Sequence, residues 1–132
     1  MDLDVNSGIF TIHLQGQYSG KLWTGEFRAK KRLSHLDRLR QDALRRELVG
    51  PNAGSATVQA NNIAIILSEL RVRLIESPEW WRNAQDGALL EDEDVLLDVY
   101  NKALKVEDDA TEQLKAEAKK LVQPLKDQAI GK

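Results

Sequence analysis

The stretch NNIAIILSELRVRLIESPEWW, residues 61–81, holds the longest apolar run of the chain and two of its three tryptophans. Apolar residues recur in it at the i, i+3, i+4, i+7 spacing of one helix face. They are Ile63, Ile66, Leu67, Leu70 and Leu74. Ile65 and Val72 lie about 180° away on the same helix. The spacing predicts a helix over residues 57–76 that is apolar on two sides, and such a helix lies at the centre of a domain or against another chain.

Trp80 and Trp81 follow this helix directly. Neighbouring side chains diverge by about 100° on a helix and by about 180° on a strand, so the two rings cannot share one flat face. We expect one ring to fill the core beside the central helix and the other to lie at the rim, available to a partner. A pair buried wholly in the core and a pair that stacks on a ligand are the alternatives.

The segments before the central helix predict a β-hairpin and one more helix. Residues 9–15 and 22–29 are rich in β-branched and aromatic side chains, and a turn at residues 16–20 separates them. Gly25 weakens the second strand or marks a bulge in it. Ser34 and Asp37 form a loose capping box at the start of a helix with Leu36, Leu39, Ala43, Leu44 and Leu48 at helical spacing, and Gly50-Pro51 ends it.

The segments after the tryptophans predict further helices. Residues 91–94 are acidic, as the start of a helix favours, and Val95, Leu96, Val99, Tyr100 and Ala103 form the buried face of that helix. Asp108-Asp109 opens a last helix with a thin apolar stripe: Ala110, Leu114, Ala118 and Leu121. The whole is predicted to be mainly α, an N-terminal β-hairpin followed by four or five helices. We expect one domain over residues 1–132, divided into a hairpin region (1–32), a helical core (33–106) and a peripheral C-terminal helix with a frayed tail (107–132).

Composition excludes several classes of protein. The chain has 132 residues, of which 42% are hydrophobic and 30% charged, and it has no cysteine. Disulfides, thiolate nucleophiles and cysteine-ligated zinc are therefore excluded. The longest apolar run is far shorter than the roughly 18 residues that cross a bilayer, and the acidic N-terminus lacks a secretory signal pattern. We expect no membrane association and residence in a cytoplasm.

The net charge of −2 conceals two oppositely charged segments. Residues 21–49 contain nine lysines and arginines against four acids, whereas residues 76–117 contain thirteen acids against four bases. Such a chain presents two surfaces of opposite sign that favour self-association, unless each run is only a solvated helix face.

No motif indicates catalysis, a cofactor or a metal. His13 and His35 lack a second ligand at metal spacing, the acidic run 91–94 lacks a calcium-loop pattern, and the glycines do not form a phosphate loop. Arg38, Arg45 and Arg46, with the basic run 30–32, could hold phosphates, but acids at i, i+4 positions offset them. The sequence predicts a protein without enzymatic activity, with nucleic acid binding as the less favoured use of this surface.

Four segments taken in order resemble one family: YSG…WTGEF (18–27), LSHLDRLRQDALRRELVG (33–50), LSELRVRLIESPEWW (67–81) and VLLDVYNKAL (95–104). Over residues 16–106 the chain resembles the tail assembly chaperones of long-tailed, siphovirus-type bacteriophages. The resemblance implies a small helical protein that self-associates in the host cytoplasm. It also implies binding to the tape measure protein, and to the tail tube subunit, during tail assembly, and absence from the mature virion.

From the pattern and the resemblance together we expect an interaction surface made by Ile65, Val72, Trp80, Trp81, Arg38, Arg45 and Arg46. Two other functions remain open at this point. One is a small regulatory protein associated with nucleic acid through the basic segment, and the other is a connector subunit that stays in a phage particle.

Overall fold

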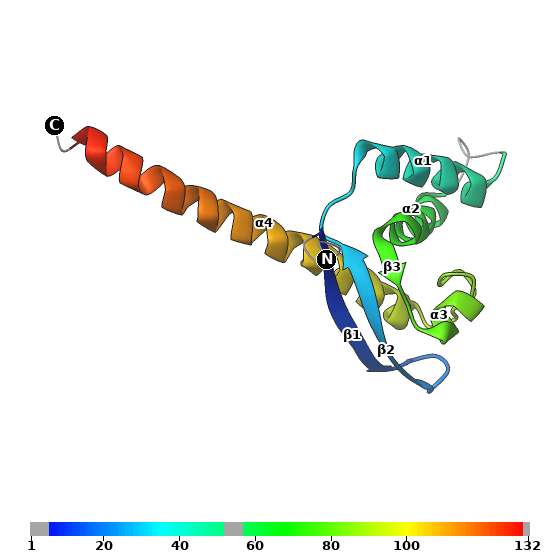
Figure 1. Ribbon diagram of the computed structural model, residues 1–132. Coiled ribbons are helices and arrows are strands. Elements are labelled where there is room, and N and C mark those ends of the chain that lie inside the picture. Colours follow the sequence, from blue (N-terminus) through cyan, green and yellow to red (C-terminus); the bar gives the residue numbers. More distant parts are fainter. Residues whose placement is uncertain (1–5, 52–56, 131–132) are drawn as a thin grey trace.

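The computed structural model describes residues 6–51 and 57–130, with the surroundings of side chains given as far as Leu121. The predicted loop at 52–55 and the terminal Gly131-Lys132 lie outside these residues. A three-stranded antiparallel sheet and four helices make up the described fold, so the prediction of a mainly α chain with an N-terminal hairpin holds in outline. Figure 1 shows the sheet and helices α1 to α3 gathered around one end of a much longer helix, α4.

The hairpin consists of β1 (Ser7–Gln15) and β2 (Leu22–Lys30), paired in step from Ser7↔Lys30 to Gln15↔Leu22. The bulge considered at Gly25 is therefore absent from this pairing, and Gly25 lies opposite Ile12. A Cβ at Gly25 would lie 2.5 Å from Cγ of Pro78, so the glycine allows another segment to approach the strand closely.

A third strand, β3 (Leu74–Glu76), corrects the predicted extent of the central helix. That helix, α2 (Val58–Arg73), begins after the cap Thr57 and ends three residues earlier than predicted. Leu74 and Glu76 pair with β2, where the register shifts between Arg28 and Ala29. Two features favour the strand: Ile75 is β-branched, and Pro78 biases the residue before it toward extended backbone.

The capping box predicted before the first helix is present. The hydroxyl of Ser34 accepts the N–H of Asp37 at 3.1 Å, and the Asp37 carboxylate accepts the N–H of Ser34 at 3.0 Å. These bonds satisfy two backbone donors at the start of α1 (His35–Val49), which ends at Gly50 with φ of 92°. A short helix, α3 (Glu79–Asn83), follows Pro78.

Helix α4 (Glu93–Ile130) corrects a second prediction. The break expected at Asp108-Asp109 does not occur, and one helix of 38 residues continues through Pro124. No glycine or proline stands between Glu93 and Gln123, and both aspartates are exposed, so nothing in this part interrupts the helix.

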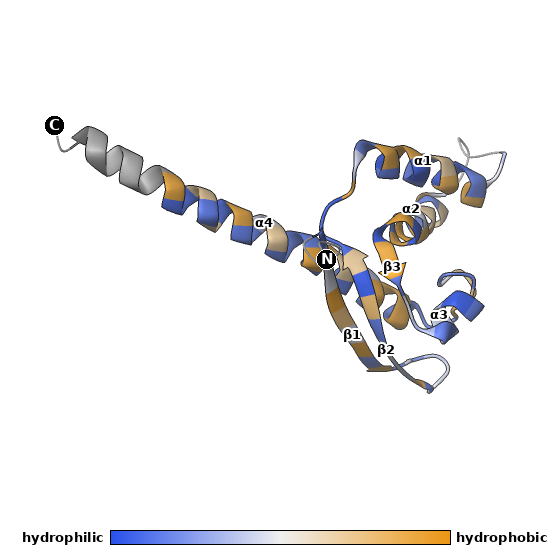
Figure 2. Cartoon of the chain, in the orientation of Figure 1, coloured by the Kyte–Doolittle hydropathy of each residue, from blue (hydrophilic) through white to orange (hydrophobic). Residues whose placement is uncertain are grey.

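The core lies between the inner face of the sheet, α2, α3 and the first four turns of α4. Its buried members are Ile12, Phe27, Ala29, Leu70, Trp81, Leu96, Val99 and Ala103. The predicted buried face of residues 95–103 is confirmed, with Tyr100 half-buried. Figure 2 shows apolar residues on the strands, on α2 and on this part of α4. In the described part of the chain no helix is long and apolar enough to cross a bilayer.

Candidate functional site

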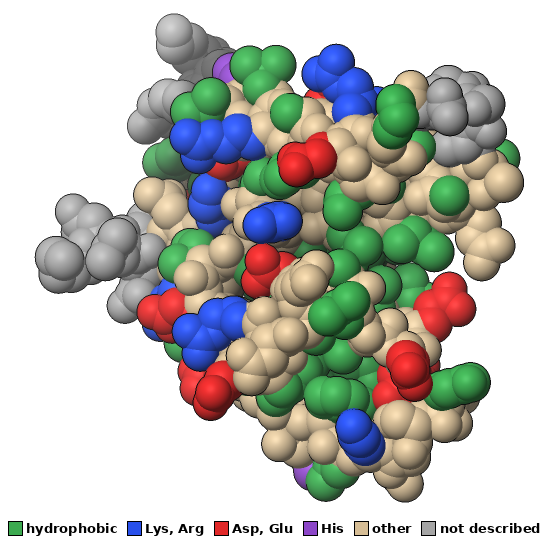
Figure 3. All heavy atoms as spheres, turned by 90° about the vertical axis from the view of Figure 1, so that its right-hand side faces the viewer, with side chains coloured by type: hydrophobic (Ala, Val, Ile, Leu, Met, Phe, Trp, Pro, Cys, Tyr) green, Lys and Arg blue, Asp and Glu red, His purple; other side chains and the backbone are tan. Residues whose placement is uncertain are grey.

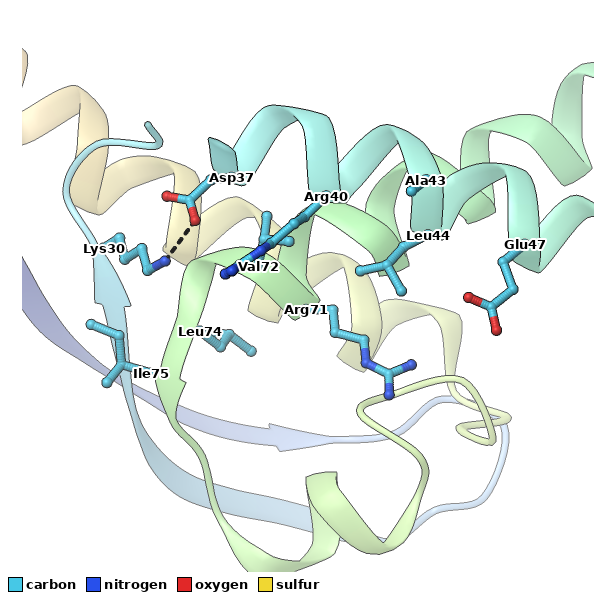
Figure 4. A pocket seen from close by; sticks show the side chains of 10 residues that line it. All are labelled: Lys30, Asp37, Arg40, Ala43, Leu44, Glu47, Arg71, Val72, Leu74 and Ile75. Atoms are coloured by element: carbon cyan, nitrogen blue, oxygen red, sulfur yellow. Dashed lines mark hydrogen bonds and ion pairs between the residues drawn. The ribbon is translucent and has the colours of Figure 1, made fainter. Parts of the chain in front are cut away.

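A groove opens between α1, the end of α2 and β3. It has a volume of about 630 Å³, and Ala43, Leu44, Val72, Leu74 and Ile75 provide its apolar lining. In Figure 4, Leu44 from α1, Val72 from α2 and Leu74 from β3 converge on the same space. Three elements distant in sequence therefore create one apolar surface, and none of the described residues fills it.

Charged side chains surround this groove. Lys30 and Asp37 form an ion pair of 2.9 Å at one end. Burial raises the pKa of Asp37, but the hydrogen bonds from Ser34 and the Lys30 ammonium together hold it below its usual value of 3.8. Arg71 lies 3.6 Å from Asp86. Arg40 and Glu47 also line the groove and have no ion-pair partner among the described residues. The groove thus has an apolar floor with charged side chains at its edge.

Beside the groove, most leucine side chains of α1 are exposed to solvent. Leu39 is 69% exposed and Leu36 is 55% exposed, although both recur at the spacing expected of a core-facing helix. The side of α1 that faces the molecule carries Asp37, Leu44 and Arg45 instead. Figure 3 views the side of the molecule that carries α1 and α2, and apolar side chains gather across it between separate charged groups. This exposed apolar surface is a candidate interaction site.

The two tryptophans have different surroundings, as the sequence predicts. Trp81 is 1% exposed and packs edge-on against Phe27 with ring centroids 5.5 Å apart. Gly87, at φ of 92°, lies against its ring, and a Cβ there would be 2.5 Å from the nearest ring carbon. Trp80 is half-buried and donates its ring N–H to the carbonyl of Thr24 at 2.8 Å.

The tryptophan pair belongs to a larger aromatic cluster, which the sequence does not indicate. Trp23 lies 4.8 Å from Trp80, and Phe10 stacks on Phe27 at 5.0 Å. These residues come from β1 and β2, more than fifty positions from the tryptophan pair. The cluster joins the hairpin to α3 and leaves only part of Trp80 for a partner.

The predicted pair Ile65 and Val72 lies on the side of α2 that faces α1. Val72 is 9% exposed and lines the groove, and Ile65, two helical turns earlier on the same stripe, is half-buried. The second apolar side of the central helix is thus largely covered within the chain by α1. Val72 contributes the groove floor, and the binding role of Ile65 stays a prediction.

The three predicted arginines differ from one another. Arg45 donates to Asn61 of α2 at 3.0 Å and to Asp42 at 3.1 Å, so it joins the two helices. Arg46 pairs with Asp42 at 2.9 Å and is 63% exposed, whereas Arg38 is exposed without an ion pair among the described residues. The structure therefore brings Arg45 near the α1–α2 contact and leaves Arg38 and Arg46 on the outer side.

Asp92 has a role that the sequence does not reveal. Its carboxylate is buried and accepts hydrogen bonds from the backbone N–H groups of Tyr18 and Ser19, the Ser19 hydroxyl and the ring N–H of Trp23, at 2.5–2.9 Å. These bonds, the Ser19 hydroxyl first, lower the pKa of Asp92 from 3.8 to about 2 although burial opposes them. Gly16 leaves room for the carboxylate. The residue fastens the hairpin turn to the start of α4.

A buried group of ion pairs connects helix α4 to the sheet and helices α1 to α3, which together with the first part of α4 are called the body below. Arg73, 1% exposed, lies 3.2 Å from Glu69 of its own helix and 3.3 Å from Glu107 of α4. It also donates to the carbonyl of Lys30 at 3.4 Å. From Glu112 to Leu121 every side chain of α4 is exposed, and residues 112–130 are called the arm below.

The described residues contain no group of three side chains suited to hold a metal ion. His13 is exposed on β1, and His35 is the first residue of α1. Comparisons of the chain with family models, curated proteins and solved structures find no match.

Proposed function

We propose that this protein is a tail assembly chaperone of a long-tailed bacteriophage that binds helices of the tape measure protein without catalysis. The groove between α1, α2 and β3 carries the proposal, because it is an open apolar surface built from three elements. A tape measure protein is a very long, helical and apolar chain that aggregates when bare. Apolar residues on one side of such a helix fit a groove of this kind, as in other helix-in-groove complexes.

The volume of the groove suits side chains better than a whole helix. A volume of about 630 Å³ accepts a few apolar residues that project from a helix lying across α1 and β3. Exposed Leu36, Leu39 and Ile75 extend the apolar area around it. Many weak contacts of this kind, repeated along one long tape measure protein, together give strong binding.

The test is co-expression with a tape measure protein from the genome that encodes this chain. Wild-type chain is expected to keep the tape measure protein soluble and to co-purify with it. Ala43→Arg places a charged side chain in the groove at an exposed helix position and is expected to abolish both effects. Ala60→Arg, also exposed on a helix but not part of the groove lining, is the matched control.

Equal capture by wild type and Ala43→Arg would contradict the groove as the binding surface, and failure of wild type to bind would contradict the function. Binding of tail tube subunits is a second partner to assay in the same way. Presence of the protein in purified virions would favour a connector subunit instead.

Nucleic acid binding is the alternative function, because the exposed Arg38 could contact a phosphate. Under the chaperone proposal, duplex DNA binds weakly, without sequence preference, and more weakly as salt rises. Submicromolar, sequence-selective binding at physiological salt would favour a regulatory protein.

A further inference from the structure

One side of α1 has a base at one end, an acid at the other and two apolar residues between them. Arg40, Ala43, Leu44 and Glu47 follow the i, i+3, i+4, i+7 spacing of one helix face, and all four line the groove; they are called the α1 face below. Figure 4 shows them in this order along α1. The base and the acid stand at equal distances from the middle of the face, about 5 Å on either side along the helix axis.

Both charges of the α1 face are available to another chain. Arg40 and Glu47 are exposed, and neither has an ion-pair partner among the described residues. The other charged residues that line the groove form ion pairs of their own. On α1 itself Asp42 pairs with two neighbouring arginines, and Arg38 lies about 160° around the helix from Arg40. The α1 face therefore carries one unpaired charge of each sign.

The apolar part of the same surface is also open. Ala43 is exposed and Leu44 is half-buried. Leu36, one turn before Arg40, is 55% exposed and continues the face, and Ile75 across the groove is 51% exposed. A helix laid along α1 would cover these side chains and would meet a charge on each side of the apolar centre.

A second α1 helix, laid antiparallel along the first, provides a partner for both charges. With a two-fold axis between Ala43 and Leu44, Arg40 of each copy lies opposite Glu47 of the other. Such a contact is isologous, because both copies use the same surface. A parallel arrangement would place Arg40 opposite Arg40 and Glu47 opposite Glu47, and like charges in contact are unfavourable. The charges thus select the antiparallel arrangement.

We infer that two copies of the chain associate through their α1 faces, antiparallel and around a two-fold axis. Any other occupant needs an acid and a base seven residues apart around an apolar centre, a pattern that a second copy has in its own sequence. The contact covers both grooves. It therefore adds a regulation that rests on the proposed function, because a tape measure helix binds only after the two copies separate. The arm leaves the body on the side opposite α1 and α2 (Figure 1), so association through the arm is a separate contact.

Two single variants test the pairing of charges in the full chain. Arg40→Glu makes the α1 face acidic at both ends, and Glu47→Arg makes it basic at both ends. Each alone is expected to dimerise about a hundredfold more weakly than wild type, because like charges meet twice in the contact. Mixed in equal amounts, the two variants are expected to form a heterodimer, since every acid then meets a base. Sedimentation equilibrium of each variant and of the mixture measures this.

Arg38→Glu is the matched control, because it makes the same change of charge on the far side of α1. It is expected to leave dimerisation within about twofold of wild type. Three results would overturn the inference. They are a mixture that associates no better than the separate variants, a control that weakens dimerisation as much as Arg40→Glu, and a wild type that stays monomeric up to about millimolar, the weak end of specific affinity.

A disulfide at the centre of the contact separates it from the proposed function. The chain contains no native cysteine. Because the axis passes beside Ala43, the two copies of this residue lie within about one residue of each other along the helices. Ala43→Cys is expected to oxidise to a linked dimer much more completely than Ala60→Cys, the matched control at an exposed position of α2. The linked dimer is expected not to bind a tape measure protein from the genome that encodes this chain, and reduction is expected to restore binding.

The outcomes of this experiment are distinct. No more linked dimer from Ala43→Cys than from Ala60→Cys would overturn the contact. A linked dimer that binds the tape measure protein as well as the reduced variant does would overturn the competition. Failure of both wild type and reduced variant to bind would contradict only the proposed function, because the contact is measured by sedimentation without any partner.

Discussion

Helix α4 passes through two different surroundings, and the comparison explains how the molecule is organised. Over Glu93–Val106 its inner side packs on the sheet, and Val95, Val99 and Ala103 have no measurable exposure. Over residues 112–121 every side chain is exposed. The first part is helical because tertiary packing stabilises it, and the second has only local support, since an isolated helix is marginal in water.

The ion pairs near and on the arm do not change this difference. Lys105–Asp109 at 3.7 Å and Lys115–Glu112 at 3.9 Å join side chains that are about 70% exposed or more. Exposed pairs of this kind contribute only tenths of a kcal/mol, about 0.3–0.5 each. The arm therefore has little support from its own chain, whereas the body fixes the groove and the base of the arm.

Removing the Trp81 ring should give the largest effect on the body. Trp81→Ala is expected to lower the free energy of unfolding by about 3–5 kcal/mol, because the ring is fully buried against Phe27. Trp80→Ala should cost less, about 1–2 kcal/mol, since that ring is half-buried. Denaturant unfolding of both variants measures this. Equal losses would show that both rings are core residues and would leave Trp80 no role at the rim.

Asp92 gives the next largest effect and makes it pH-dependent. Its folded pKa of about 2 lies below the ordinary 3.8, so the ionised form stabilises the fold. That stabilisation is complete above about pH 3.8 and is lost as the pH falls toward 2. Asp92→Asn should lower the melting temperature at pH 7 and flatten the decline between pH 4 and 2, as followed by thermal unfolding. A decline of unchanged steepness in the variant would assign it to other carboxylates, Asp37 and Asp42 among them.

Changes in the arm should affect association and leave stability nearly unchanged. Leu121→Asp should alter the free energy of unfolding by less than about 0.5 kcal/mol, as for other exposed positions. The same change should weaken self-association about tenfold to a hundredfold, the cost of a leucine no longer buried at a contact. Sedimentation over a concentration series measures the second effect. Ala116→Asp, exposed on the other side of the helix, is the control.

Much of the body could be predicted from local patterns. The capping box of Ser34 and Asp37, the two-sided central helix and the different burial of Trp80 and Trp81 follow from spacing along the chain. Spacing fails where long-range contacts decide the outcome. Leu74–Glu76 continues a helical pattern, but pairing with β2 makes it a strand.

The features of the candidate site were harder to predict for the same reason. Asp92 lies 69 positions from Trp23, and no local signal marks the hydrogen bond between them. The leucines of α1 have core-like spacing, yet periodicity cannot tell which side of a helix another element covers. The groove arises from that uncovered side, and a run of exposed leucines can be recognised only once the neighbours of α1 are known.

Amide hydrogen exchange over a range of protein concentrations tests the central claim most directly. In dilute solution the amides of residues 112–121 are expected to exchange much faster than those of 95–106. As concentration rises, exchange should slow in the arm, because self-association covers its exposed leucines. Arm amides whose exchange does not change with concentration would contradict the account.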